Sequence, residues 1–183
     1  LQYAMECAKQ KEVCLYFTSM RPKDLLIHAA SIDFDLQHYM NQNQIIVVRV
    51  APPGNLDEVD NSDPFLAEYL KDIVTVVDQY QPNKIVFDEL TPFIGFNNVN
   101  LLQEVFLQTT ESIEEASITS LFIIGDPATQ TARTITDALA TYSTGVIYLQ
   151  KKDDSTRRTQ GGRMIITPNV GHTEGQFKAD YHI

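Results

Sequence analysis

The sequence predicts an α/β fold: a mostly parallel sheet flanked by helices, with an antiparallel hairpin at the carboxyl-terminal end. Three observations lead to this prediction. Short apolar segments alternate with segments whose apolar residues recur at helical spacing. Two apolar segments, IIVVRV at 45–50 and SLFIIG at 120–125, are nearly continuous, as expected for strands buried on both faces. The last strand-like segments, 163–167 and 176–183, follow one another without a helix between them.

The amino-terminal half begins the alternation of helices and strands. The expected helices lie at 1–10, from 21 onward and from 62 onward, and the expected strands at 12–18, 44–50 and 84–90. Pro22 and Pro64 fit the first turn of a helix, because the missing N–H of proline costs no hydrogen bond there. Between 65 and 77 the apolar residues form the stripe of a helix that lies on a sheet.

The second half continues the alternation and then ends in strands. Its expected helices lie at 97–115 and 129–142, and its expected strands at 118–124, 145–150, 163–167 and 176–183. Ligands of such sheets bind at the carboxyl ends of the strands. The candidate site positions are therefore Thr18–Ser19, Asp88–Glu89 and Gly125–Asp126.

Composition and charge restrict the class of protein. The chain has 183 residues, of which 14 are basic and 24 acidic, and the net charge of −10 opposes general binding of duplex DNA. Its length suits a single domain over 1–183 with a core of its own. No apolar stretch reaches the roughly 20 residues of a membrane span. Cys7 and Cys14 make no disulfide framework, so a cytoplasmic location is the default expectation.

The segment KIVFDEL at 84–90 carries the clearest chemical signal. A largely apolar strand ends in Asp88 and Glu89, and buried carboxylates need a cation or hydrogen-bond donors. In P-loop NTPases an acidic residue at this place holds Mg²⁺ beside the phosphates. The alternative is a strand that simply ends in two solvated acids. The phosphate loop G-x-x-x-x-G-K-[ST] is absent from this sequence, because no lysine precedes serine or threonine.

The order of these segments resembles the RecA-superfamily ATPases, in the branch that holds KaiC and RadA. LQYAMECAKQKEVCLYF is similar to the helix after the phosphate loop and the next strand, and RPKDLLIHAASIDFD to the helix that follows. KIVFDELTPF resembles the Walker B strand, and GVIYLQKK with GGRMIITPNVGHTEGQFKADYHI the last core strand and terminal hairpin. The resemblance implies a RecA-like fold, ATP as cofactor and Mg²⁺ held by Asp88. Thr18 and Ser19 are candidate nucleotide contacts because they lie at the carboxyl end of the expected strand 12–18.

Two departures from the family limit what the resemblance implies. The chain begins just past the expected phosphate loop, so it lacks the strand that lies mid-sheet in the family, which would leave a gap of roughly 10 Å. The neighbouring strands could close up, another chain could fill the slot, or the polypeptide extends upstream of Leu1, which we expect. Family members also place glutamates after the second strand, where residues 16–21 hold no carboxylate. Glu89 is the remaining candidate base, and we expect slow or absent hydrolysis.

Positive charge gathers before the terminal hairpin, at Lys151, Lys152, Arg157, Arg158 and Arg163. In RadA-like relatives this neighbourhood lies near a subunit boundary and reaches a neighbour's nucleotide, so Lys151, Lys152 and Arg163 are candidate nucleotide contacts. The alternative is a solvated loop between two strands. No aromatic residue interleaves with these charges, which weakens a nucleic-acid interpretation.

The sequence therefore predicts a KaiC-like ATPase domain that acts as a regulatory or assembly module. Its full-length form is expected to use ATP and Mg²⁺, whereas this chain is expected to bind neither tightly. Self-association follows from the resemblance, and a protein partner is a further expectation. The alternatives are a non-catalytic interaction module that has kept the fold, and a recombinase-like binder of single-stranded DNA, which the acidic charge opposes.

Overall fold

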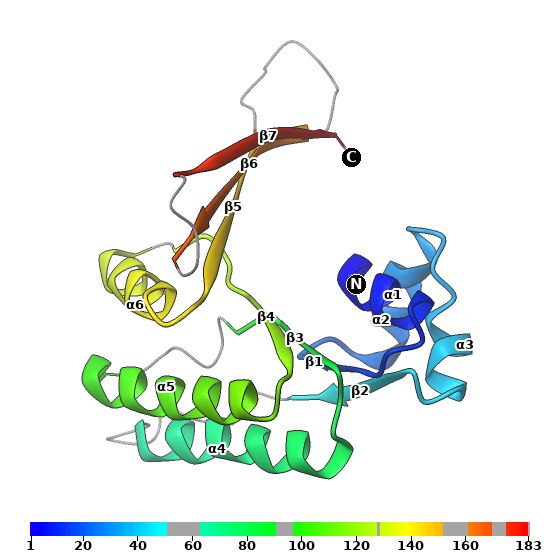
Figure 1. Ribbon diagram of the computed structural model, residues 1–183, viewed down its shortest axis with the longest axis horizontal. Coiled ribbons are helices and arrows are strands. Elements are labelled where there is room, and N and C mark those ends of the chain that lie inside the picture. Colours follow the sequence, from blue (N-terminus) through cyan, green and yellow to red (C-terminus); the bar gives the residue numbers. More distant parts are fainter. Residues whose placement is uncertain (51–62, 91–96, 128, 152–160, 170–174, 183) are drawn as a thin grey trace. The chain divides into compact units, whose positions relative to one another are not determined.

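The computed structural model describes residues 1–50, 63–90, 97–127, 129–151, 161–169 and 175–182. They form two compact units, Leu1–Ile135 and Thr136–Ile183, which are described separately (Figure 1). Within the described residues, no helix combines the length and apolar character that crossing a membrane requires.

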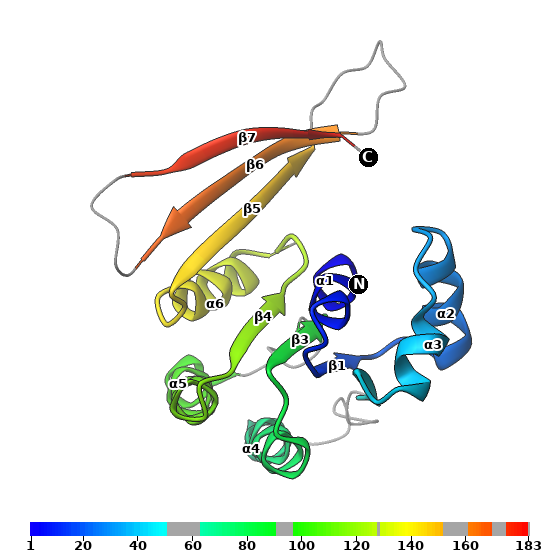
Figure 2. The same ribbon diagram turned by 45° about the vertical axis from the view of Figure 1, so that its right-hand side comes forward.

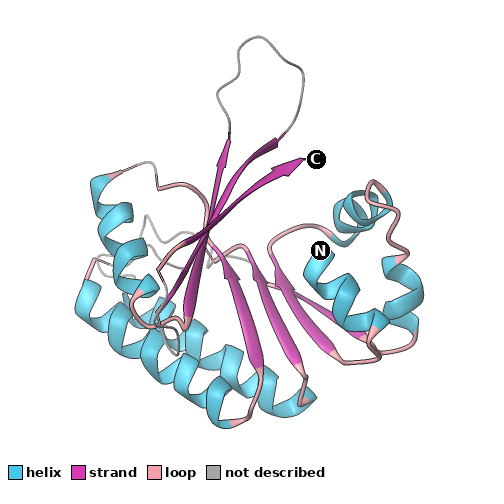
Figure 3. Cartoon of the chain, turned by 45° about the horizontal axis from the view of Figure 1, so that its top comes forward, coloured by secondary structure: helices cyan, strands magenta, loops and turns pink. Residues whose placement is uncertain are grey.

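The first unit is built on a parallel sheet of four strands, shown in Figure 3. The strands are β1 (Cys14–Thr18), β2 (Ile45–Arg49), β3 (Lys84–Asp88) and β4 (Thr119–Ile123), in the order β2-β1-β3-β4. All three pairings are parallel. The apolar alternation in the sequence predicted each of these strands, and the structure confirms the α/β fold with a mostly parallel sheet.

Helices cover both faces of this sheet. They are α1 (Gln2–Lys9), α2 (Pro22–Ala30), α3 (Leu36–Asn41), α4 (Asp63–Tyr80) and α5 (Val99–Glu115). Helix α6 (Gln130–Ala140) follows β4 in the chain and spans the boundary between the two units. Figure 2 shows α4 and α5 side by side on one face of the sheet and α1 on the other. The sequence predicted all of them except α3, which begins where the Asp35 carboxylate accepts a hydrogen bond from His38 N at 3.0 Å.

Aromatic rings fill the face of the sheet toward α5. Phe17, Phe87 and Phe122 lie in register on β1, β3 and β4. Their rings stack with centroids 4.7 Å apart in both pairs, and Phe106 of α5 meets Phe122 edge-on at 5.1 Å. Successive side chains of a strand point to opposite faces. Tyr16 and Asp88 therefore belong to the other face, which α1 covers.

The expected mid-sheet gap is not found inside the parallel sheet. β1 pairs directly with β2 and β3, and β3 with β4, so the four strands are continuous. Strand β5 (Gly145–Lys151), which the resemblance made the last core strand, instead pairs with β6 (Gly161–Pro168). Among the described strands, β4 and β5 are each the edge of a different sheet.

The second unit contains an antiparallel sheet of three strands, β5, β6 (Gly161–Pro168) and β7 (Phe177–His182), in that order. The hairpin that the sequence predicted is β6 and β7, which pair antiparallel. Gly162 is required where it lies, because a Cβ atom there would come 2.1 Å from the carbonyl oxygen of Gln150. Asn169 fastens the end of β6, since its Nδ2 donates to the carbonyls of Ala140 and Ser143 at 2.9 and 2.8 Å.

Candidate functional site

The carboxyl ends of β1 and β3 bring two predicted site residues together. Thr18 and Asp88 are register partners on these neighbouring strands, so both side chains leave the sheet on the same face. Thr18 is buried, with 1% of its surface exposed, whereas Asp88 is half-buried. Arg49 of β2 is the register partner of Thr18 on its other side. The Asp88 carboxylate and the exposed Arg49 side chain therefore belong to one row across the carboxyl ends of β3, β1 and β2.

Tyr16 is the partner that satisfies the Asp88 carboxylate. Its hydroxyl donates a hydrogen bond to Asp88 Oδ2. The ring is 1% exposed and packs in the core cluster beneath α1, with Ala4, Cys7 and Val86. The nitrogen of Leu1 lies 3.5 Å from the Tyr16 hydroxyl oxygen, so α1 begins beside this pair. The start of a helix, a phenol and a carboxylate therefore meet at one point.

Burial keeps the Tyr16 phenol protonated. Removal from water is the largest cause of a raised Tyr16 pKa, and the hydrogen bond to Asp88 and the charge of that carboxylate raise it further. The hydroxyl is therefore protonated at neutral pH and is the donor in its hydrogen bond to Asp88. The sequence did not single out Tyr16, although a tyrosine inside a buried strand needs a hydrogen-bond partner and could have signalled one.

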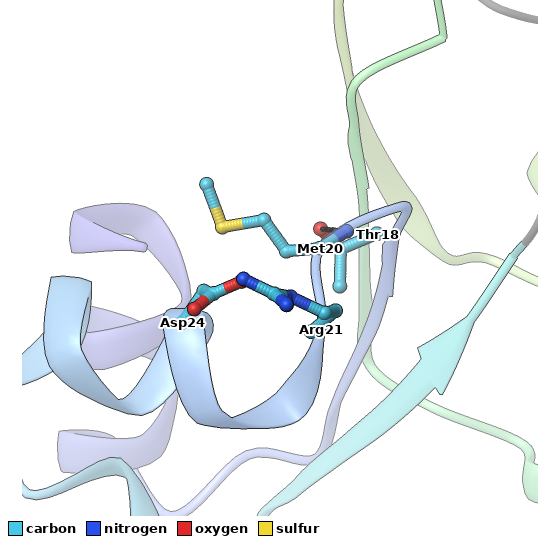
Figure 4. A network of polar contacts seen from close by, with 4 residues as sticks. All are labelled: Thr18, Met20, Arg21 and Asp24. Carbon is cyan, nitrogen blue, oxygen red and sulfur yellow. Dashed lines mark hydrogen bonds and ion pairs between the residues drawn. The ribbon is translucent and has the colours of Figure 1, made fainter.

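The turn after β1 is closed by its own polar groups. Thr18 Oγ1 accepts a hydrogen bond from Met20 N at 3.2 Å, and the Thr18 carbonyl accepts one from Val50 N at 2.9 Å. Met20 packs against the core cluster beneath α1. Figure 4 shows this turn running into α2. The hydroxyl oxygen and the carbonyl oxygen of Thr18 thus each accept a hydrogen bond from within the protein.

The first carboxylate after β1 is Asp24, and it is paired. Asp24 Oδ2 lies 2.6 Å from Arg21 Nε in an exposed contact across the first turn of α2 (Figure 4). The hydrogen bond that Arg21 Nε donates to Asp24, together with the charge of that carboxylate, raises the pKa of Arg21. The stretch from Thr18 to Asp24 therefore offers no carboxylate that is free of a cation.

Glu89 extends beyond β3 and is exposed. The peptide bond between Asp88 and Glu89 is cis. Leu90 N donates to the Ile123 carbonyl at 2.8 Å, which fastens the segment after Glu89 to β4. The role of Glu89 as a base stays a prediction.

A buried carboxylate at the start of α4 binds the backbone at the start of α5. Asp63, 4% exposed at the start of α4, accepts hydrogen bonds from Asn97 N and Asn98 N, both at 2.8 Å. Asn98 in turn caps α5, because its Oδ1 accepts from Leu101 N at 3.2 Å. Asp63 therefore joins the starts of α4 and α5. The sequence marked it as a helix start, and its bridging role depends on contacts that only the fold creates.

The basic candidates belong to the second unit. Lys151 ends β5, and Lys152, Arg157 and Arg158 lie outside the described residues. Arg163 is on β6, and its Nε lies 3.8 Å from Asp180 Oδ1 in an exposed ion pair. Contact of Lys151, Lys152 or Arg163 with a nucleotide stays a prediction.

The side chains at the carboxyl ends of β1 and β3 fit a magnesium ion that is held partly by the protein and partly by a bound phosphate. Mg²⁺ usually takes one or two carboxylates from the protein and completes its shell with water and phosphate oxygens. Asp88 alone supplies such a carboxylate beside Thr18. Within the described ranges no three His, Cys, Asp or Glu side chains converge as in an all-protein metal site. The arrangement suits a cation shared with a phosphate.

The two cysteines form a separate buried pair. Cys7 of α1 and Cys14 of β1 are 4% and 0% exposed and carry no disulfide. Burial is the main cause that raises the pKa of Cys7 to about 11 and that of Cys14 to about 12. Both therefore remain neutral thiols and behave as core residues.

Comparisons with known proteins agree with this fold. The sequence pattern of the family described as "ATPase: KaiC" matches residues 1–170. The chain is also similar in structure to a KaiC-like protein of the hyperthermophilic archaeon Pyrococcus horikoshii OT3, with a TM-score of 0.70 and 18% identity over 98% of this chain and 76% of that chain. At that identity the structural likeness concerns the fold alone. No curated protein sequence matches the chain.

Proposed function

The chain belongs to the KaiC family of ATPases, and from this premise we propose that it is a regulatory or assembly domain whose nucleotide site is at the carboxyl ends of β1 and β3. In the form of these 183 residues it hydrolyses ATP slowly or not at all. The observation that carries the proposal is the half-buried Asp88 carboxylate, held by Tyr16 at the start of α1.

Asp88 is the residue that would hold Mg²⁺. Bound there with ATP, the ion would neutralise charge on the phosphate oxygens. The start of α1 supports a phosphate beside it, because the N–H groups at a helix start favour anions. Thr18 and Ser19 flank this place. Thr18 Oγ1 already accepts from Met20 N, so its hydroxyl would meet a nucleotide as a hydrogen-bond donor.

Weak hydrolysis follows from the turn after β1. A general base must lie within hydrogen-bond reach of the water that it activates. The turn carries Ser19 and Met20, neither of which is basic at neutral pH, and Met20 is packed against the core cluster. The next carboxylate, Asp24, is paired with Arg21. Glu89 remains the candidate for any residual activity.

Calorimetric titration of the chain with Mg²⁺-ATP tests the proposal, with Asp88→Ala and the exposed Asp78→Ala as matched variants. We expect weak binding, at millimolar nucleotide, which Asp88→Ala abolishes and Asp78→Ala preserves. Released phosphate should stay far below the turnover of about 1 s⁻¹ or more that is usual for enzymes. Turnover in that range, or binding unchanged by Asp88→Ala, would contradict the proposal.

Self-association is the second part of the proposal, and it rests on the family. Sedimentation at rising protein concentration, with and without Mg²⁺-ATP, should show a mass above the 20.7 kDa of one chain. A strictly monomeric mass at high concentration would count against assembly.

A non-catalytic interaction module is the alternative that the closed turn at Thr18–Met20 favours. It predicts assembly with no effect of nucleotide. Binding of single-stranded DNA has less support, because the net charge is −10 and Arg163 is paired with Asp180. A steep loss of DNA affinity with salt would revive it.

A further inference from the structure

We propose that Tyr16 is the residue that positions the Asp88 carboxylate for a divalent cation, so that Asp88 binds the ion through one oxygen in a fixed orientation. The inference rests on the function proposed above and adds to it a residue outside the candidate site that the sequence predicted. It starts from one contact: the Tyr16 hydroxyl donates to Asp88 Oδ2 across two neighbouring strands.

The register of β1 and β3 explains how this contact forms. Tyr16 is opposite Val86, and Thr18 is opposite Asp88. Tyr16 and Asp88 are thus diagonal neighbours on one face, and a tyrosine side chain is long enough to span such a diagonal. The contact needs both the parallel register and the alternation of side chains, so it is a property of the assembled sheet.

The Tyr16 hydroxyl is held in place by its surroundings. The ring is 1% exposed and packs against Ala4, Cys7 and Ala8 of α1 and Val86 of β3. A ring packed on all sides keeps one rotamer. Its hydroxyl is therefore a fixed donor, unlike a serine or lysine group that could follow the carboxylate as it turns.

Because Tyr16 holds one oxygen of the Asp88 carboxylate in place, the position of the other oxygen is defined as well. With Oδ2 engaged by Tyr16, the carboxylate cannot rotate freely, and Oδ1 is the oxygen left to meet a cation. Mg²⁺ accepts only near-octahedral geometry, so the orientation of a carboxylate ligand matters to it. Hydrogen-bond partners of ligating groups typically change metal affinity 10- to 100-fold when they are removed.

Tyr16→Phe removes the hydroxyl and keeps the ring, and Tyr39→Phe is the matched control. Tyr39 packs against the same core cluster, where its ring contacts Phe34, and makes no described contact with Asp88. Asp88→Asn removes the ligand itself. Thermal unfolding of each variant shows that it is folded before any cation is added.

The readout is the broadening of backbone amide NMR signals by Mn²⁺ alone, which detects weak and local binding. In the unsubstituted chain we expect broadening centred on Asp88 and Thr18. Asp88→Asn should abolish it, Tyr16→Phe should raise the Mn²⁺ concentration at half-broadening about ten-fold, and Tyr39→Phe should leave it unchanged. A purely structural role for Tyr16 would alter stability without moving this midpoint.

Two other outcomes would contradict the proposal, one of them against the role of Tyr16 and the other against the metal site itself. An equal or lower midpoint in folded Tyr16→Phe overturns the positioning role and leaves the metal role of Asp88 intact. No broadening near Asp88 in the unsubstituted chain overturns the metal site in the proposed function, and the role of Tyr16 with it.

If Tyr16→Phe fails to fold, a second measurement tests the positioning role without any substitution at Tyr16. The chain is labelled with 3-fluorotyrosine, and the fluorine resonance of Tyr16 is identified as the one that Asp88→Asn displaces. This resonance should shift as Mg²⁺ is added, with the same titration midpoint as the amide signal of Asp88. A resonance that stays constant through the Mg²⁺ titration overturns the positioning role.

Discussion

Replacing Asp63 by asparagine tests how the starts of α4 and α5 are joined. The buried carboxylate accepts hydrogen bonds from Asn97 N and Asn98 N, both at 2.8 Å. A hydrogen bond to a charged group contributes about 1.5–3 kcal/mol to stability. Asparagine keeps one carbonyl acceptor and turns an NH₂ group toward the second N–H, so one bond weakens and one is lost.

The expected loss in the free energy of unfolding is about 2 kcal/mol, at the lower end of that range because Asn97 and Asn98 are exposed and water can reach them. For a chain of this size it corresponds to a fall in Tm of roughly 6 °C. Asp63→Ala, which removes both acceptors, should cost about 3 kcal/mol.

Urea unfolding followed by circular dichroism measures the loss, with Asp78→Asn as the matched control. Asp78 is on the same helix, is exposed, and undergoes the same change of charge. The control should change stability by less than about 0.5 kcal/mol. If Asp63→Asn costs no more stability than the control, the two hydrogen bonds from Asn97 N and Asn98 N do not hold the helix starts together.

Three further predictions concern the rest of the first unit. Phe87→Ala should cost about 3 kcal/mol, because it empties the middle of the ring stack, whereas Phe65→Ala, at a side chain 54% exposed, should cost under about 1 kcal/mol in urea unfolding. Lys11→Gly should raise the unfolding free energy by about 0.5 kcal/mol, because φ is 62° there, and a loss of stability would contradict this. Alkaline pH should destabilise the fold. The pKa values of Cys7 (about 11) and Cys14 (about 12) are raised above the 9.0 of a free thiol. The stability that the two neutral thiols contribute is therefore complete below pH 9 and is lost as the pH rises toward 12. Unfolding at pH 8 and 10.5 should show this fall, and replacing both cysteines by alanine should reduce it, leaving the part due to the raised pKa of Tyr16.

The four parallel strands were predictable because each is a short apolar segment between turn residues. Helix α3 was not, because it has only six residues, LQHYMN, and the apolar spacing of Leu36, Tyr39 and Met40 is too short to establish a period. The strand at β5 was predicted, but its sheet was not. Val146, Ile147 and Leu149 suit any sheet, and the partner of a strand is decided by contacts far away in the sequence.

The candidate site divides in the same way. Thr18 and Asp88 were predictable, because the carboxyl ends of parallel strands meet at one edge of a sheet. Tyr16 was not, because its contact with Asp88 depends on the register of two strands that are 72 residues apart in the chain. Asp63 was recognised as a helix start, and its bond to the start of α5 likewise depends on how two helices pack.

We propose that the carboxyl ends of β1 and β3 form the nucleotide site. Mapping the backbone amide NMR shifts of the chain during titration with Mg²⁺-ATP tests it most directly, because it locates even weak binding. We expect shifts at Thr18, Ser19, Asp88 and the first turn of α1, all lost in Asp88→Ala. Shifts confined to other parts of the described chain, or shifts at this edge that persist in Asp88→Ala, would contradict it.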